Sequence, residues 1–98
     1  MIFETISLEK ADELLKTGAV LVDVRSKEEY DAWHLQGSIN IPHTEILTSA
    51  KEIIKDKKTP VIVYCSAAKR SKQAWDFLKF LDYENVYVVG TYSLSAKS

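Results

Sequence analysis

Residues 61–71, Val61-Ile62-Val63-Tyr64-Cys65-Ser66-Ala67-Ala68-Lys69-Arg70-Ser71, join an apolar run of strand length to the start of a helix. Four consecutive apolar residues are typical of a strand that is covered on both faces, as in a parallel sheet. From Ser71 onward the apolar residues recur at helical spacing, namely at Ala74, Trp75, Leu78 and Leu81. The segment therefore predicts a buried strand, a short loop and a helix that Ser71 caps.

The same alternation of strand and helix extends in both directions from this segment. Further strands are expected at 2–5, 19–24, 38–41 and 86–89. Further helices are expected after Ser7, from Ser26 through Trp33 where Glu29 completes a capping box, and from Thr44 with Ile46, Leu47, Ala50, Ile53 and Ile54 buried. The simplest arrangement is an α/β fold with a central, mostly parallel five-stranded sheet and helices on both faces.

Length and composition place the chain among ordinary globular domains. Its 98 residues suit one domain covering 1–98, and 46% are hydrophobic, which is too many for a disordered chain. The net charge of −1 does not indicate a nucleic-acid binder, and no apolar run approaches the roughly 20 residues that span a membrane. One cysteine and two histidines make a poor zinc site, so we expect no metal and no cofactor. A reduced, cytoplasmic protein is expected, with a periplasmic form that has lost its signal peptide as the alternative.

Three residues that follow expected strands are candidates for a ligand site. Ligand sites of parallel sheets lie beyond the carboxyl ends of the strands, which points to Arg25, Cys65 and Gly90. A loop of small residues before a helix N-terminus turns backbone N–H groups inward and forms an anion-binding nest. The nest is expected from Ser66, Ala67, Ala68, Lys69, Arg70 and Ser71, two of which are cations.

Such surroundings favour a thiolate over a thiol, so we expect a lowered pKa for Cys65. The thiolate would be a nucleophile that faces a pocket for a small oxyanion. Thiosulfate fits this description, because a thiolate can take its outer sulfur; phosphate and arsenate esters are alternatives. The other interpretation is that Cys65 is a small buried apolar residue, which is the usual fate of a lone cysteine.

Three motifs together identify a family. Residues 21–25 end a strand in Asp-Val-Arg, and residues 28–42 contain Glu-Glu-Tyr followed by His-Leu-Gln-Gly-Ser-Ile-Asn-Ile-Pro. Residues 61–71 match an active-site strand and loop with Cys65 and Arg70. In these motifs the chain resembles the single-domain rhodaneses, over about residues 6–90. Its short length is similar to that of the small phage-shock-protein E type of rhodanese.

The resemblance implies a thiosulfate sulfurtransferase that works through a persulfide on Cys65. Four residues separate Cys65 from Arg70, which suits sulfurtransferases; the phosphatases that share the fold place the arginine one residue later. The expected partners are a small-molecule sulfur donor and a thiol or cyanide acceptor, with a protein acceptor left open. We expect a monomer. A phosphatase or arsenate reductase and a non-catalytic binding module of the same fold remain alternatives.

Some residues depart from the family pattern or are expected to be structural. Ala68 stands where the family usually has glycine, and would cost about 1 kcal/mol or more if the position needs a positive φ. Gly90 is followed by threonine in place of a second glycine, and 91–98 are expected to form a mobile tail. Asp23 and Arg25 are interpreted as a pair that braces the loop, and Trp33, Trp75 and Tyr64 as core or pocket-wall residues.

Overall fold

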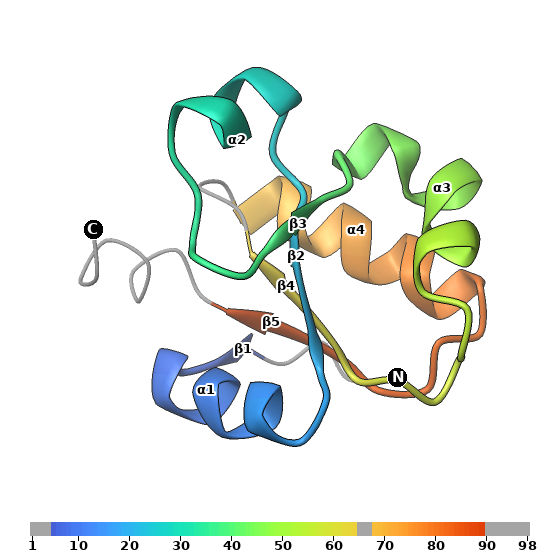
Figure 1. The fold of residues 1–98 in the computed structure, drawn as a ribbon. Coiled ribbons are helices and arrows are strands. Elements are labelled where there is room, and N and C mark those ends of the chain that lie inside the picture. Colours follow the sequence, from blue (N-terminus) through green and yellow to red (C-terminus); the bar gives the residue numbers. More distant parts are fainter. Residues whose placement is uncertain (1–4, 65–67, 90–98) are drawn as a thin grey trace.

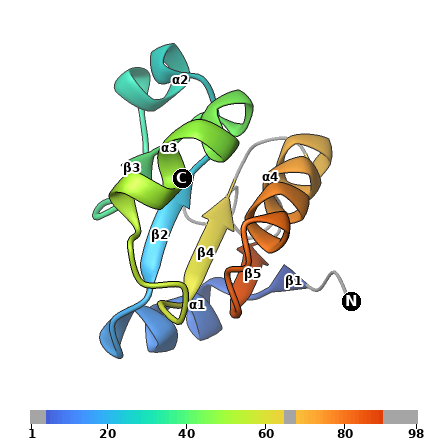
Figure 2. The same ribbon diagram turned by 90° about the vertical axis from the view of Figure 1, so that its right-hand side faces the viewer.

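The computed structural model describes residues 5–64 and 68–89 of the chain. Within these ranges one five-stranded sheet has the order β1-β5-β4-β2-β3, and every neighbouring pair is parallel. The strands are β1 (Thr5–Ile6), β2 (Val20–Asp23), β3 (Ile39–Asn40), β4 (Val61–Tyr64) and β5 (Val86–Val89). Figure 2 shows β2 and β4 pointing to the same end of the molecule.

Helices cover both faces of the sheet, as expected. They are α1 (Leu8–Lys16), α2 (Lys27–Ala32), α3 (Ile46–Ile53) and α4 (Ala68–Phe80), with a short 3-10 helix η1 (His43–Glu45) before α3. Helix α1 lies against one face, α3 and α4 lie against the other, and α2 lies above the carboxyl ends of the strands (Figure 1). The predicted α/β architecture is therefore confirmed.

Successive residues of the central strands alternate between two apolar cores. In β4, Val61 and Val63 pack toward α3 and α4, whereas Ile62 and Tyr64 pack toward α1. All four side chains are fully buried. This two-sided burial explains why the strand is a continuous apolar run, because a side-chain period of two gives each face every second residue.

Local signals account for the starts of two helices. The side chain of Ser7 accepts a hydrogen bond from the backbone of Lys10, so it caps α1 as expected. Ser26 and Glu29 form the predicted capping box of α2. Strand β1 occupies Thr5–Ile6, whereas the expected strand was 2–5, of which residues 2–4 lie outside the described part of the chain.

Two expectations about helices are wrong. Helix α4 begins at Ala68, so Ser71 lies inside its first turn and is not its N-cap, because Ala68, Lys69 and Arg70 all favour helix. In α3 the buried residues are Ile46 and Ala50, followed by Ile54 at its end, while Leu47 and Ile53 are exposed. The helix packs into the larger core through one narrow row of side chains rather than the broad stripe that the sequence suggested.

The register aligns the carboxyl ends of the central strands. Asp23 of β2 lies opposite Tyr64 of β4 and Asn40 of β3, and Tyr64 lies opposite Val89 of β5. Every segment that follows these strands therefore starts at one edge of the sheet. Helix α2 and the N-terminal end of α4 meet at this edge.

Candidate active site

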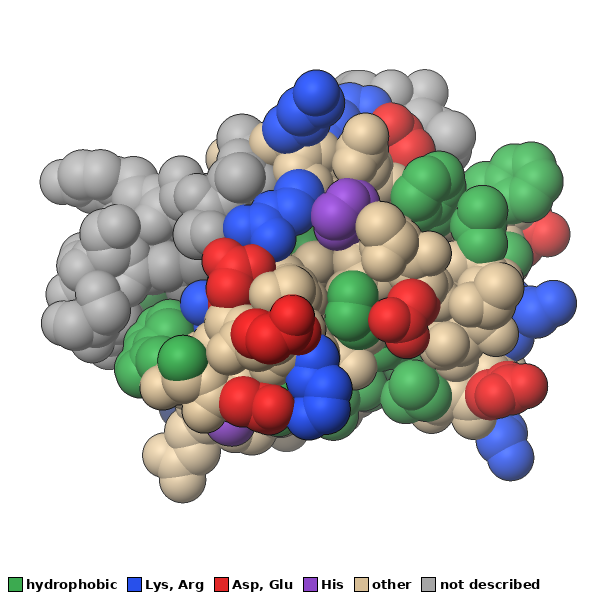
Figure 3. Space-filling view, turned by 90° about the horizontal axis from the view of Figure 1, so that it is seen from above, with side chains coloured by type: hydrophobic (Ala, Val, Ile, Leu, Met, Phe, Trp, Pro, Cys, Tyr) green, Lys and Arg blue, Asp and Glu red, His purple; other side chains and the backbone are tan. Residues whose placement is uncertain are grey.

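The edge where β2 and β4 end carries side chains of both charges. Figure 3 views this end of the molecule and shows basic and acidic side chains lying next to one another. The predicted nucleophile, Cys65, directly follows Tyr64 in the sequence. The predicted positions Cys65, Ser66 and Ala67, and also Gly90, lie outside the described residues.

Helix α4 starts close behind the strand that leads into the loop. Strand β4 ends at Tyr64 and α4 begins at Ala68, so three residues connect them. Ala68 belongs to the helix, and Asp82 is the one non-glycine residue with a positive φ within the described ranges. The cost that a left-handed backbone would impose on alanine at position 68 is therefore absent.

Ser71 lies in the first turn of α4 with an unsatisfied hydroxyl. The residue is 2% exposed, and its Oγ is buried without a hydrogen-bond partner among the described residues. Leaving a buried hydroxyl unpaired costs about 1–3 kcal/mol, so such groups are rare and point to a missing acceptor. A sulfur or oxyanion at the preceding loop would supply that acceptor.

Arg70 is held by a carboxylate that the sequence analysis did not assign to the site. Its Nη1 donates to Glu29 Oε1 at 2.7 Å, and its Nη2 donates to Glu29 Oε2 at 3.3 Å. The sequence places Glu29 in a capping box and in the Glu-Glu-Tyr motif, and neither pattern indicates a partner 41 positions away. The contact arises because α2 lies over the start of α4.

The carboxylate of Glu29 is surrounded by donors. Its Oε1 also accepts from the backbone N–H and the hydroxyl of Ser26, both at 3.1 Å. The hydrogen bonds from Arg70 and from the Ser26 backbone lower the pKa of Glu29 to about 2. Glu29 is thus ionised at any pH near neutrality.

Lys69 has different surroundings from Arg70. It is exposed, and it forms no hydrogen bond or ion pair with another described residue. The first turn of α4 therefore carries one cation fixed against α2 and one cation in solvent. Both flank the positive end of the helix dipole, which favours anions.

Asp23 and Arg25 form a buried ion pair at the end of β2. Asp23 is fully buried, and its carboxylate accepts from Arg25 Nη2 at 2.8 Å, from Nε at 3.1 Å and from the Arg25 backbone at 2.9 Å. Arg25 also donates to the backbone carbonyl of Trp33. The hydrogen bond to Asp23 raises the pKa of Arg25, so the guanidinium keeps its charge. The pair ties the end of β2 to the end of α2.

Tyr64, the residue before Cys65, belongs to the same network. Its hydroxyl donates to Asp23 Oδ2 at 2.7 Å, accepts from the Leu35 backbone at 2.9 Å, and lies 3.0 Å from Ser38 Oγ. Burial raises the pKa of Tyr64 to about 12. The last residue of β4 is therefore fixed by three groups, which gives the loop a rigid base.

The aromatic residues at this end differ in burial. Tyr64 and Trp75 are buried, as expected for core residues, whereas Trp33 is 43% exposed. The Trp33 ring lies 5.5 Å from the guanidinium of Arg25, so it covers the buried ion pair rather than the core. His34 stacks on Tyr30 and its Nδ1 lies 2.7 Å from the Tyr30 carbonyl.

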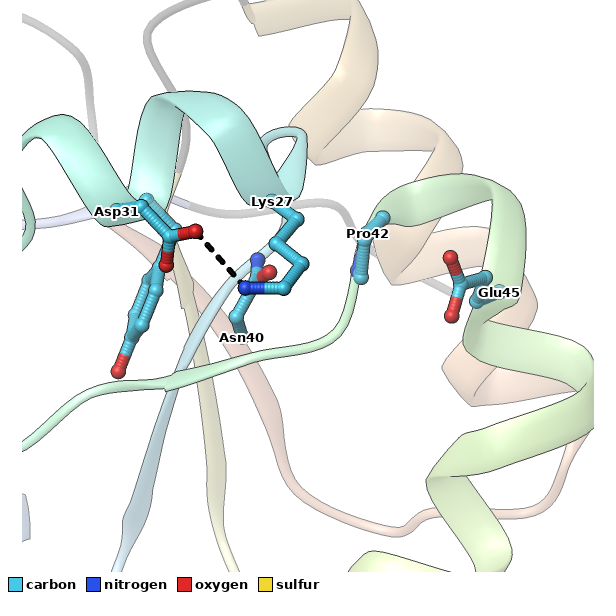
Figure 4. Close-up of a pocket in the computed structure, with 6 residues that line it drawn as sticks. Lys27, Asp31, Asn40, Pro42 and Glu45 are labelled. Carbon is cyan, nitrogen blue, oxygen red and sulfur yellow. Dashed lines mark hydrogen bonds and ion pairs between the residues drawn. The ribbon is translucent and has the colours of Figure 1, made fainter.

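A hollow of about 300 Å³ lies beside α2, at the β3 edge of the sheet. Lys27 and Asp31, which line it, form an ion pair at 2.8 Å; Figure 4 marks this pair with a dashed line. Strand β2 separates β3 from β4, so the hollow is distinct from the loop site. Within the described residues no three His, Cys, Asp or Glu side chains are grouped to hold a metal, and no helix is long and apolar enough to cross a membrane.

Comparisons with known proteins agree with this arrangement. The family model for the rhodanese-like domain matches residues 7–92. The thiosulfate sulfurtransferase PspE of Escherichia coli K12 is 39% identical over 69 residues, which cover 70% of this chain and 66% of that protein. The thiosulfate sulfurtransferase GlpE of Pseudomonas syringae is 32% identical over 87 residues, covering 89% of this chain and 80% of that protein.

Solved structures give the same result. A rhodanese with anions from E. coli has a TM-score of 0.69 and 38% identity, covering 74% of this chain and 85% of that one. The human single-domain sulfurtransferase TSTD1 has a TM-score of 0.80 and 25% identity, covering 96% of each chain.

Proposed function

The chain belongs to the rhodanese-like domain family and is a sulfurtransferase, and on this basis we propose that it moves sulfane sulfur through a persulfide on Cys65. The proposed donor is thiosulfate or a related small oxyanion, and the proposed acceptor is cyanide in an assay or a thiol in the cell. The proposed substrate-binding residues are Ser66, Ala67, Ala68, Lys69, Arg70 and Ser71. Cytoplasmic localisation and a monomeric state remain predictions.

The observation that carries the proposal is the buried hydroxyl of Ser71, which has no hydrogen-bond partner among the described residues. It lies at the N-terminal end of a 13-residue helix, directly beyond the strand that leads to Cys65. A hydroxyl there has a proton to donate, and a thiolate, a persulfide or a sulfonate oxygen is a suitable acceptor. The helix dipole and Lys69 add favourable charge for the same anionic groups.

The reaction proceeds in two displacements. The Cys65 thiolate attacks the outer sulfur of thiosulfate, a new S–S bond forms, and the S–S bond of thiosulfate breaks with its electron pair leaving on sulfite. The acceptor nucleophile then attacks the outer sulfur of the persulfide, and the Cys65 thiolate leaves with the electron pair of that bond. No net oxidation occurs, and the first step needs no general base because the nucleophile is already ionised.

Hydrogen bonds among the described residues fix the end of β4, from which the loop with Cys65 departs in the sequence. The network of Tyr64 with Asp23, Leu35 and Ser38 fixes the strand end from which the loop departs. The N–H groups of the loop and of the first turn of α4 would receive the negative charge that remains on the persulfide, as an oxyanion hole does for oxygen.

A steady-state assay with thiosulfate and cyanide on the wild type and on Cys65→Ser tests the proposal. We expect thiocyanate formation by the wild type, no turnover by Cys65→Ser, and a mass increase of one sulfur atom on the wild type after thiosulfate treatment. Ser71→Ala, which removes the hydroxyl but keeps the helix, is expected to lower kcat/KM by about tenfold, the cost of one hydrogen bond to a charged group. Turnover of an aryl phosphate with none of thiosulfate would overturn sulfur transfer, and the absence of any adduct would indicate a binding module.

A further inference from the structure

Glu29 and Arg70 make a two-pronged contact between separate elements. The two terminal nitrogens of the guanidinium each donate to a different oxygen of the carboxylate, at 2.7 Å and 3.3 Å. The side chains are 25% and 38% exposed, and ion pairs with this exposure contribute little to stability. The pair instead determines how the Arg70 side chain is oriented, because a planar guanidinium that donates to both oxygens of a carboxylate is held in one orientation.

Hydrogen bonds that do not involve Arg70 also fix the Glu29 side chain. The backbone N–H and hydroxyl of Ser26 both donate to Oε1, which closes the capping box of α2. The cap uses Oε1 alone, whereas Oε2 accepts from Arg70 Nη2 and from no other described residue. Capping therefore accounts for one oxygen of the carboxylate, and the second oxygen needs another explanation.

We propose that Glu29 is a positioning residue, which fixes the Arg70 guanidinium so that it meets the small oxyanion donor in one orientation. The inference rests on the function proposed above, since it places Arg70 at the donor. An arginine that is already ordered loses less side-chain entropy when an anion binds, so the donor binds more tightly. Positioning of this kind acts through Arg70 and not through contact of Glu29 with the substrate.

The ion pair also gives Lys69 and Arg70 different roles at the start of α4. The charges of Glu29 and Arg70 sum to zero, so Lys69 provides the net positive charge of the first turn of α4. Arg70 then contributes directed hydrogen bonds at short range. Loss of the carboxylate has two opposite effects: it increases the positive charge, and it frees the arginine to change rotamer.

Glu29→Gln separates these effects because glutamine keeps the capping box. Its oxygen still accepts from Ser26 and from Arg70 Nη1, while its NH₂ group replaces Oε2 and cannot accept from Arg70 Nη2. The two-pronged contact is thereby reduced to one hydrogen bond, and the guanidinium loses its single fixed orientation. We expect the KM for thiosulfate to rise about tenfold, with kcat within about twofold of the wild type. A fall in KM would mean that Glu29 merely neutralises charge, and would overturn the proposal.

A double-mutant cycle tests whether Glu29 acts through Arg70. In the Arg70→Ala background, Glu29→Gln is expected to cause no further rise in KM. The same tenfold rise in both backgrounds would show that the carboxylate acts independently of Arg70. Asp31→Asn is the matched control, because it makes the same chemical change on the same helix, where Asp31 pairs with Lys27; its KM should equal that of the wild type.

Protection of Cys65 against iodoacetamide by inorganic sulfate gives a reading that needs no turnover. Glu29→Gln is expected to raise the half-protecting sulfate concentration about tenfold in the wild-type background and not in the Arg70→Ala background. If the wild type does not turn over thiosulfate, the proposed function is wrong. The protection measurement in the two backgrounds still tests whether Glu29 positions Arg70. Equal shifts in the two backgrounds would show that it does not.

Discussion

The two neighbouring cations at the start of α4 illustrate how surroundings set the role of a residue. Lys69 and Arg70 are adjacent in the sequence, which predicts that both belong to the anion-binding nest. In the structure Arg70 is bound to Glu29, whereas Lys69 is exposed and pairs with no described residue. Lys69 is thus suited to attract anions from solvent, and Arg70 to orient them.

This difference leads to a prediction about ionic strength. Lys69→Ala should raise the KM for thiosulfate by about fivefold at about 0.01 M salt and hardly at all at about 1 M, because the Debye length falls from about 30 Å to about 3 Å. Initial rates at several salt concentrations measure the effect. Lys79→Ala, at the far end of the same helix, is the control and should show no such change. An effect of Lys69→Ala that is independent of salt would contradict a long-range role.

At the scale of elements, one tyrosine joins the end of α3 to the turn after α4. Tyr83 is 1% exposed, and its hydroxyl donates to the backbone carbonyls of Ala50, at 3.1 Å, and Ile54. The Ala50 carbonyl also accepts from the Ile54 backbone N–H at 2.7 Å, whereas the Ile54 carbonyl lies at the C-cap of α3, where helix carbonyls lack partners within the helix. Asp82, with φ of 73°, turns the chain so that Tyr83 can reach them.

Tyr83→Phe should therefore destabilise the protein by about 1–3 kcal/mol, because the buried carbonyl of Ile54 loses its donor. Denaturant unfolding followed by circular dichroism measures the change. Tyr87→Phe removes the same hydroxyl from a half-buried tyrosine whose hydroxyl has no partner within the described ranges, and its effect should stay within about 0.5 kcal/mol. If the two substitutions have equal effects, the hydrogen bonds of the Tyr83 hydroxyl to α3 do not stabilise the protein.

At the scale of the whole molecule, the sheet is sealed by different numbers of helices on its two faces. The larger core lies under α3 and α4, and the smaller core lies under α1. Charged groups that connect elements gather at the carboxyl edge: Asp23 with Arg25, and Glu29 with Arg70. Tyr64 lies at the same edge, so the stability of the edge depends on pH at the acid extreme through Glu29 and at the alkaline extreme through Tyr64.

The pKa values define the expected pH windows. Glu29 has a pKa lowered from 4.5 to about 2, so its contribution to folding is present above pH 4.5 and is lost as the pH falls toward 2. Tyr64 has a pKa raised from 10.0 to about 12, so its contribution is present below pH 10 and is lost as the pH rises toward 12. Chemical denaturation as a function of pH measures both limbs. Glu29→Gln should flatten the acid limb and leave the alkaline limb; an unchanged acid limb would refute the assignment.

Local patterns in the sequence determined the elements and the chemistry expected of the loop. The apolar runs at 19–24 and 61–64, the capping box at Ser26, and the four residues between Cys65 and Arg70 each depend on neighbours within a few positions. Hydrogen bonds of caps and the alternation of strand faces act over the same short range, so these features can be predicted without the fold. The sheet with helices on both faces followed from them.

Tertiary structure alone decided which distant groups meet. Glu29 reaches Arg70 across 41 positions, and Tyr64 reaches Asp23 across the same separation, because the parallel register brings the ends of β2 and β4 together. The start of α4 at Ala68 and the exposure of Leu47 and Ile53 likewise depend on how the helices pack on the sheet. Contacts of this kind are set by the relative placement of whole elements, about which spacing along the chain carries no information.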